Sequence, residues 1–262
     1  MIVVKDLTLD NIEDVFRICS RNRLNDPLQE EGICIKREWL LEMLEEIGPI
    51  TKIGYYNEEP SAQVMFYPEK AVPYIPFPRE MVLRIECIYN SNPEAQGKGI
   101  GSELIENLKR DARTGMDCLG GESPEFIVVN VFNTGEGISM EEFYLSKGFK
   151  RGKDELFYEI KGKYYPSIMI EYENRVEDKN KALIFYDRNC EYSYTFAKLK
   201  KETIMEIKPD LEVILIDVWK KPSEFASRGG NYLIINSVPI DTHIGNREEF
   251  VNEVQIALEN NF

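Results

Sequence analysis

Two glycines one residue apart, Gly99 and Gly101, lie where a predicted strand gives way to a predicted helix. An apolar run from Met81 to Tyr89 predicts the strand, and a helical pattern begins near Ile100. Glycines at such a junction remove Cβ atoms and allow consecutive backbone N–H groups to point into one concavity at the positive end of the helix dipole. This junction is therefore a candidate phosphate or pyrophosphate site.

The residue pattern of the glycine segment distinguishes between three kinds of phosphate-binding loop. A dinucleotide fingerprint, G-x-G-x-x-G, requires further strand-helix units, and the residues that follow do not supply them. A Walker-type loop requires G-K-[ST], but Lys98 is followed by Gly99. The remaining pattern, Q/R-x-x-G-x-G/A, is met by Gln96, Gly99 and Gly101.

That remaining pattern resembles the pyrophosphate loop of the GNAT superfamily of acyl-CoA-dependent N-acetyltransferases. A second match lies downstream: residues 126–133 are typical of a strand ending in an asparagine, and residues 142–149 resemble the family's late "fYek-GF" helix and turn. The resemblance implies a GNAT acyl-CoA N-acyltransferase fold, α/β with a mixed sheet, and acetyl-CoA (coenzyme A) as cofactor. The implied reaction moves an acetyl group to a primary amine by direct attack.

Direct attack requires one group that accepts a proton from the amine and one that protonates the departing thiolate. The resemblance implies that Tyr144 faces the thioester sulfur as the acid, and that Glu86, in the strand before the loop, is the base. The structural alternatives are a tyrosine packed in the core with Phe143 and Phe149, and a Glu86 paired with Arg84 or lying at the sheet surface.

The resemblance also implies that the cofactor is held mainly by backbone groups. The backbone of residues 88–90 would pair with the pantetheine amides, and the N–H groups of residues 96–102 would take the pyrophosphate. Lys98 either adds a charge near the 3′-phosphate or faces solvent. Asn133 would hydrogen-bond the cofactor or the helix backbone, but the segment that follows it, residues 134–138, is longer than the family's usual link. The expected cofactor-binding set is Ile88, Tyr89, Asn90, Gln96, Gly97, Lys98, Gly99, Ile100, Gly101, Ser102 and Asn133.

Composition limits the partners. The 262 residues carry 46 Asp and Glu against 32 Lys and Arg, a formal charge of −14, which disfavours binding to nucleic acid or anionic membranes and suits a small-molecule or peptide amine acceptor. No run approaches the roughly 20 apolar residues of a membrane span, and we expect a cytoplasmic protein. Five cysteines without a C-x-x-C pair, together with a single histidine, His243, predict neither a disulfide framework nor a metal site.

Periodicity predicts the other elements of the first part of the chain. A proline-rich loop is expected over residues 68–78, either lining an acceptor pocket or purely structural. The other predicted elements are strands over residues 2–9, 50–56, 63–67 and 156–160, and helices from about residue 11 to 20 and over residues 36–47.

About one hundred residues follow Gly162 and restart a strand-helix alternation. Strands are predicted over 182–187, 211–219 and as a pair within 232–240, with helices over 193–207 and to about 258. This order resembles a smaller thioredoxin-like α/β domain, more narrowly the YoaP-like domain appended to some GNAT proteins. We expect domains over residues 1–162 and 181–262, joined by a linker over 163–180.

Cys190 opens the first helix of this second part, where thioredoxins carry C-x-x-C. A helix N-terminus lowers a thiol pKa, but a resolving cysteine is missing and Glu191 opposes thiolate formation. Two alternatives to the transferase therefore stay open: a non-catalytic acyl-CoA-binding adaptor, and a monothiol redox protein acting through Cys190. The acceptor, the acyl-chain length and the oligomeric state do not follow from the sequence.

Overall fold

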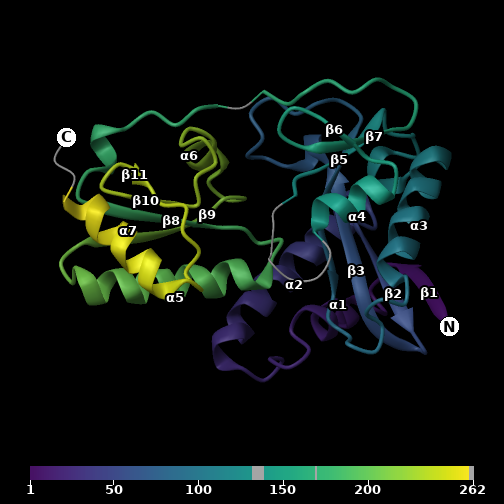
Figure 1. Cartoon of the computed structure of the whole chain (residues 1–262), viewed down its shortest axis with the longest axis horizontal. Coiled ribbons are helices and arrows are strands. Elements are labelled where there is room, and N and C mark those ends of the chain that lie inside the picture. The colour runs from purple at the N-terminus through teal and green to yellow at the C-terminus, as the bar shows by residue number, and fades with distance from the viewer. Residues whose placement is uncertain (132–138, 169, 260–262) are drawn as a thin grey trace. The chain divides into compact units, whose positions relative to one another are not determined.

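The computed structural model describes residues 1–131, 139–168 and 170–259, and the chain divides into two units (Figure 1). The first unit comprises Met1–Leu24, Leu40–Val72 and Phe77–Ser167. The second comprises Asn25–Trp39, Pro73–Pro76 and Ile168–Phe262. Two short segments from the first part of the chain thus belong to the second unit. No helix in the described part of the chain is long and apolar enough to cross a membrane.

The first unit is built on a mixed sheet, which is seven-stranded over the described residues, in the order β1-β2-β3-β4-β5-β7-β6. Among the described strands of this sheet, β4 and β5 pair in parallel, and all other neighbouring strands pair antiparallel. The strands are β1 Ile2–Asp6, β2 Thr51–Tyr56, β3 Glu59–Pro68, β4 Val82–Asn90, β5 Phe126–Val129, β6 Lys150–Arg151 and β7 Leu156–Glu159. The predicted α/β class with a mixed sheet is confirmed.

Helices cover both faces of this sheet. Gly54 of β2 lies against the Ile100 side chain of α3, whereas Gln63 of β3, paired opposite Ile53, donates to the Cys19 Sγ of α1 at 2.9 Å. Because neighbouring strand residues point to opposite faces, α1 and α3 lie on opposite sides. The helical segments are α1 Ile12–Cys19, α2 Pro27–Ile47, of which residues 27–39 belong to the second unit, α3 Ile100–Thr114, α4 Met140–Ser146 and the short 3₁₀ turns Glu69–Ala71 and Asp117–Leu119.

The expected strand before the glycine segment and the helix beginning at Ile100 are both confirmed. The second helix begins at Pro27, well before the predicted start at Lys36. Asp26 explains this, because its Oδ1 accepts a hydrogen bond from the Leu28 N–H at 3.0 Å and caps a helix that opens with proline. Strand β3 also begins earlier than predicted, since the turn after β2 needs only Asn57 and Glu58, both with positive φ.

Strand β4 changes its pairing halfway along. Its residues 82–85 pair with β5, and no later residue of β4 has a β5 partner in the described part of the chain. On the other side, Met65 pairs with Cys87 and Phe66 with Ile85, so Glu86 is an extra residue in β4, a β-bulge. Among the residues described, the end of β4 therefore has no strand partner on its β5 side, immediately before the glycine segment.

The second unit has a sheet in the order β11-β10-β8-β9 over the residues described, with β8 and β9 parallel and the other pairs antiparallel. Its elements are β8 Lys181–Tyr186, α5 Glu191–Ile207, β9 Glu212–Asp217, α6 Pro222–Ala226, β10 Leu233–Ile235, β11 Val238–Pro239, α7 Arg247–Glu259 and the 3₁₀ turn Val176–Asp178. Neither α6 nor the short strand β6 was expected from the sequence, since both are too short to show a period.

Apolar residues cover both faces of the second sheet. On one face, Ile184 and Ile235 pack with Phe250 of α7 and Ile204 of α5. On the other face, a second cluster includes Phe225 of α6. Every residue of β8 from Ala182 to Phe185 is buried, and because successive side chains of a strand point to opposite faces, both faces of the sheet are covered.

Candidate functional site

The glycine segment has the conformation that its sequence predicts. Gly97 and Gly99 have φ values of 70° and 88°, and a Cβ atom at either position would meet no other atom within 4 Å. The backbone conformation, rather than crowding, therefore requires glycine at both positions. Gly99 is the N-cap of α3, and within the described part of the chain no side-chain cap hydrogen bond closes this helix end.

The first turn of α3 offers unpaired donors. The Glu103 N–H bonds to the Gly99 carbonyl at 3.0 Å, so it is the N–H groups of Ile100, Gly101 and Ser102 that lack acceptors within the helix. Gln96, Gly97, Lys98 and Gly99 are exposed, and Ser102 is half-buried. The geometry is that of an open anion cradle at the positive end of a 15-residue helix.

Two further elements border this cradle. A Cβ placed on Gly101 would lie 3.5 Å from the ring of Phe143 in α4 and 3.9 Å from the Cδ1 of Ile88 in β4. The first turn of α3 thus lies against both α4 and the unpaired end of β4. Of the expected cofactor residues, Ile88 and Gly101 are brought together, and Tyr89 and Asn90 follow on the same strand end. Asn133 lies outside the described residues.

Two asparagines hold the approach to the cradle. Asn92 is 1% exposed and donates from Nδ2 to the Ser61 Oγ at 2.8 Å, while its Oδ1 accepts from the Glu94 N–H at 3.0 Å. The Asn90 Oδ1 accepts from the Asn92 N–H at 3.0 Å. Asn92 was not among the expected site residues, although an asparagine before a proline is a turn signal that could have identified it.

Tyr144 is completely buried, and its hydroxyl has no hydrogen-bond partner among the described residues. Its ring packs against those of Phe143 and Phe149, with centroids 5.2 and 5.1 Å away. Burial, with a smaller contribution from Cys87, raises the pKa of Tyr144, so the phenol keeps its proton at neutral pH. The packing of the ring agrees with the alternative in which Tyr144 is a core residue. A buried tyrosine with a purely structural role usually has a hydrogen-bond partner for its hydroxyl, however, and none is found here among the described residues.

Glu86 is the bulged residue of β4 and is half-buried. It makes no ion pair within the described residues, and Arg84 instead contacts Glu69 at 3.4 Å. The expected structural alternative, a pair between Glu86 and Arg84, is therefore wrong. A bulge re-aims a side chain, and here it separates Glu86 from the regular alternation of the strand.

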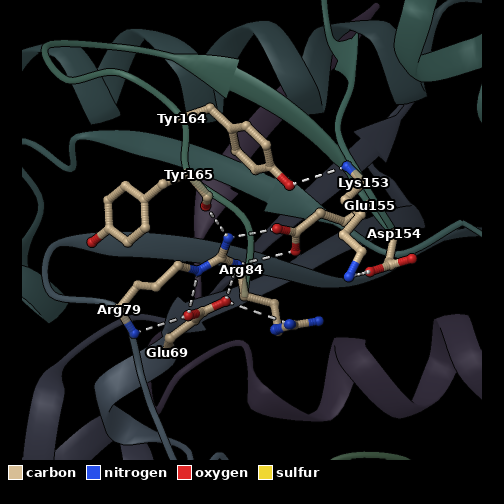
Figure 2. A network of polar contacts seen from close by, with 8 residues as sticks. All are labelled: Glu69, Arg79, Arg84, Lys153, Asp154, Glu155, Tyr164 and Tyr165. Carbon is tan, nitrogen blue, oxygen red and sulfur yellow. Dashed lines mark hydrogen bonds and ion pairs between the residues drawn. The ribbon is translucent and has the colours of Figure 1, made fainter. Parts of the chain in front are cut away.

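A buried ionic network at the base of the proline-rich loop was not expected from the sequence (Figure 2). Arg79 donates from Nε to the Glu69 Oε2 at 2.9 Å, from Nη2 to the Glu155 Oε2 at 3.0 Å and from Nη1 to the Tyr165 carbonyl at 2.9 Å. Arg79 is 5% exposed, Glu69 1% and Glu155 7%. Burial alone would raise the pKa of Glu69, but Arg79 and Arg84 outweigh it and lower the pKa below its usual value.

In the second unit, the start of α5 is occupied by other segments of the chain. Tyr74 donates to the Asp187 Oδ2 and Trp219 Nε1 to the Asp187 Oδ1, both at 2.6 Å. Lys36 lies 3.3 Å from the buried carboxylate of Glu191. Residues of the second unit from outside α5 thus pack around the N-terminal end of this helix.

The Cys190 thiol reaches the surface, but desolvation by the surrounding protein raises its pKa. Lys36 and nearby backbone groups lower the pKa by less than that. The lowering expected at a helix N-terminus is therefore outweighed by burial, and the net shift of the Cys190 pKa is upward.

We predict that Cys190 is alkylated slowly at neutral pH and faster as the pH rises, because only the thiolate reacts and burial disfavours it. Iodoacetamide labelling followed by peptide mass spectrometry, with Cys190→Ser as the control, measures this. Labelling at pH 7 faster than that of an unstructured cysteine peptide would contradict the prediction and restore the monothiol alternative.

The second unit also contains a cavity of about 420 Å³. Its lining includes the apolar residues Leu183, Ile214 and Ile216. Four acidic and four basic residues also line it, and two pairs of them join, Arg228 with Asp178 at 2.6 Å and Lys221 with Glu224 at 2.8 Å, so the lining carries no net excess of one charge. Among the residues described, no group of three potential ligands could hold a metal ion.

No protein-family model and no curated protein match the chain. Among solved structures it is similar to a GNAT family acetyltransferase from Brucella melitensis in complex with acetyl-CoA, at 15% identity over 64% of this chain and 91% of that one, with a TM-score of 0.41. It is also similar to an N-acetyltransferase from Staphylococcus aureus Mu50, at 16% identity over 61% of this chain and 97% of that one, with a TM-score of 0.44. A third similar structure is the Bacillus subtilis N-acetyltransferase YlbP in complex with coenzyme A, at 19% identity over 61% of this chain and 97% of that one, with a TM-score of 0.36. At these identities and TM-scores, the functional assignment rests on the chain's own residues.

Proposed function

We propose that the first unit is an acetyl-CoA-dependent N-acetyltransferase of the GNAT type that acts on a primary amine. The observation that carries the proposal is the fully buried hydroxyl of Tyr144, which has no hydrogen-bond partner among the described residues and belongs to the helix that borders the glycine cradle. An acyl transfer site needs these two features together, a held pyrophosphate and a proton donor for a leaving thiolate. Three of the similar structures are described as complexes with acetyl-CoA or coenzyme A.

The residues present suit that cofactor. The open backbone of residues 96–102 would take the pyrophosphate, and Lys98, exposed beside it, would meet a further phosphate. The edge of β4 beyond Ile85, which β5 leaves unpaired, offers N–H and C=O groups to the pantetheine amides. Bound acetyl-CoA would supply the thioester, and the protein would supply its orientation and the two proton transfers.

Each proton transfer has one candidate residue. Tyr144 would donate its proton to the leaving sulfur, since a phenol with a raised pKa is fully protonated before the reaction. Glu86, half-buried at the bulge and outside any ion pair of the described chain, would accept the proton of the attacking amine. No metal enters this mechanism.

Tyr144→Phe is expected to lower kcat by about 10²-fold, because it removes the acid and leaves the cradle intact. The free energy of unfolding should be unchanged or slightly higher, since the lost hydroxyl has no partner among the described residues. Thiol release from acetyl-CoA across a panel of amines measures kcat, after calorimetric titration has established one-to-one acetyl-CoA binding.

Tyr55→Phe is the matched control. Tyr55 is 8% exposed and its hydroxyl donates to the Asp14 Oδ2 at 2.6 Å, so this variant should lose about 1.5–3 kcal/mol of stability and keep its kcat. If Tyr144→Phe and Glu86→Gln both release thiol at the wild-type rate, the catalytic assignment is wrong. Acetyl-CoA binding without turnover on any amine would favour the adaptor alternative.

The second unit completes the proposal. The order of β8, α5 and β9 with the antiparallel pair β10 and β11 supports a thioredoxin-like, YoaP-like domain over residues 181–262, joined by the linker 163–180 to a transferase domain over 1–162. We propose that it presents or restricts the amine acceptor, because Cys190 has no second cysteine at C-x-x-C spacing for dithiol chemistry. A cytoplasmic location stays a prediction of the sequence.

A further inference from the structure

Arg84 of β4 has more hydrogen-bond donors than the described structure uses. Its side chain is only 16% exposed, yet one of its five N–H groups, on Nη2, donates to the Glu69 Oε1 at 3.4 Å, and this is its one side-chain hydrogen bond among the described residues. Its Nε is buried without a partner there. Figure 2 shows Arg84 joined to the ionic network through Glu69, whereas Arg79 makes five side-chain hydrogen bonds in that network. A largely buried guanidinium with unused donors suits the binding of an anionic ligand.

The register of the sheet places Arg84 on the face that α1 covers. Arg84 pairs directly with Tyr67 of β3, and directly paired residues share a face. Tyr67 lies on the same face as Gln63, four residues earlier in β3, because side chains alternate along a strand. The Gln63 side chain in turn donates to Cys19 of α1. The Arg84 side chain therefore belongs to the α1 face, opposite to α3.

The α1 face is also the face from which an amine would reach the acyl group. In the proposed function the thioester lies where β4 and β5 part, beyond Ile85. On the other face α3 and α4 meet there, since Ile88 and Phe143 both lie against Gly101.

Two charged residues of β4 flank this opening. Arg84 precedes Ile85, the last residue that pairs with β5 in the described chain, and Glu86 follows it. Glu86 makes no ion pair within the described residues, whereas Arg84 has the unused donors. The two residues are separated by roughly 6–7 Å of extended strand. Together they are complementary in charge to a small molecule that carries both an amine and a carboxylate.

We propose that Arg84 is a specificity-determining residue that binds the carboxylate of the amine acceptor, which makes the acceptor a small zwitterionic amine such as an amino acid. The inference rests on the proposed function, because that function brings an amine to Glu86. The guanidinium would hold the carboxylate through its N–H groups, while Glu86 would accept the proton of an amine a few bonds away. A polyamine lacks the carboxylate and would bring a second positive charge toward Arg84.

The test offers the full-length protein pairs of amines that differ in the carboxylate: histidine with histamine, phenylalanine with phenethylamine, and lysine with cadaverine. Thiol release from acetyl-CoA gives kcat/KM for each amine. We expect the wild type to prefer the carboxylated member of at least one pair by about tenfold or more, as a charge-assisted hydrogen bond would provide. Arg84→Met should remove that preference by lowering kcat/KM for the carboxylated member alone.

The variants have internal controls. Arg84→Met should fold, because Glu69 keeps three hydrogen bonds from Arg79. The ratio of the two kcat/KM values within one preparation does not depend on the fraction of folded protein. Arg84→Lys, which keeps the charge and loses the planar fork, should retain part of the preference. Lys70→Met, which removes an exposed ion pair with Glu80, should retain all of it.

Equal or better use of the amine without a carboxylate in every pair would overturn the inference and leave the proposed function standing. An equal loss for both members of the pairs in Arg84→Met would also overturn it, because such a loss indicates a structural role. Absence of thiol release with every amine, in a protein that binds acetyl-CoA in calorimetric titration, overturns the proposed function and this inference with it.

Discussion

Arg79→Met is expected to lower the free energy of unfolding by about 3–5 kcal/mol, the largest stability effect that we expect of any single substitution. The substitution removes the guanidinium that lies 2.9 Å from Glu69 and 3.0 Å from Glu155, which leaves the buried Glu155 without an ion-pair partner among the described residues and Glu69 with only Arg84, at 3.4 Å. An uncompensated buried charge is far more costly than a missing surface pair. Because whole domains are stable by only about 5–15 kcal/mol, much of the protein should be unfolded or insoluble.

Urea unfolding followed by tryptophan fluorescence and circular dichroism measures this effect. The control is Lys70→Met, which removes an ion pair with Glu80 whose side chains are 67% and 71% exposed, and should change stability by less than about 1 kcal/mol. Similar midpoints for the two variants would show that the buried network contributes no more than the exposed pair.

The difference in the free energy of unfolding between wild type and Arg79→Met should depend on pH in a definite direction. In the wild type the pKa of Glu69 is lowered, so its stabilising contribution is present above the ordinary carboxyl pKa of 4.5 and is lost as the pH falls through the lower folded value. In Arg79→Met, burial without that partner disfavours the charged form of Glu69, and protonation relieves the penalty. The stability difference between wild type and variant should therefore narrow as the pH falls, and a difference that widens would contradict the assignment.

Gly99→Glu is expected to weaken acetyl-CoA binding by about 10³-fold. It places a carboxylate at the open cradle, where repulsion between unit charges about 4 Å apart is worth about 4 kcal/mol near a protein surface. The φ of 88° at this position adds strain of about 1–2 kcal/mol, but that strain lowers the stability of the free protein rather than the affinity. Calorimetric titration with acetyl-CoA measures the change.

Gly120→Glu separates charge at the cradle from backbone strain. Gly120 has a φ of 65°, and a Cβ there would also meet nothing within 4 Å, but it follows the 3₁₀ turn Asp117–Leu119 instead of opening α3. This variant should lose a similar amount of stability and bind acetyl-CoA as the wild type does. Unchanged affinity in Gly99→Glu, with the protein folded, would mean that the cradle does not hold the pyrophosphate.

Local sequence was enough for the elements that form the cradle. An apolar run and a helical period, separated by glycines, predict β4 and α3 within a residue, because such patterns depend on near neighbours along the chain. The start of α2 at Pro27 also depends on a neighbouring residue, because Asp26 caps the helix, but the sequence-based prediction did not include this cap. Short elements such as β6 and α6 lie below the length at which a period can be read.

The sequence by itself determined the α/β class, the glycine-dependent turn at the start of α3 and the identity of Tyr144 and Glu86 as candidates. Only the tertiary structure decided that Tyr144 is buried without a partner among the described residues, that Glu86 lies at a bulge, and that Cys190 has a raised pKa. The same holds for Arg79, whose carboxylate partners lie 10 and 76 residues away along the chain. Burial and ion pairing depend on which distant segments pack together, and no local pattern encodes that choice.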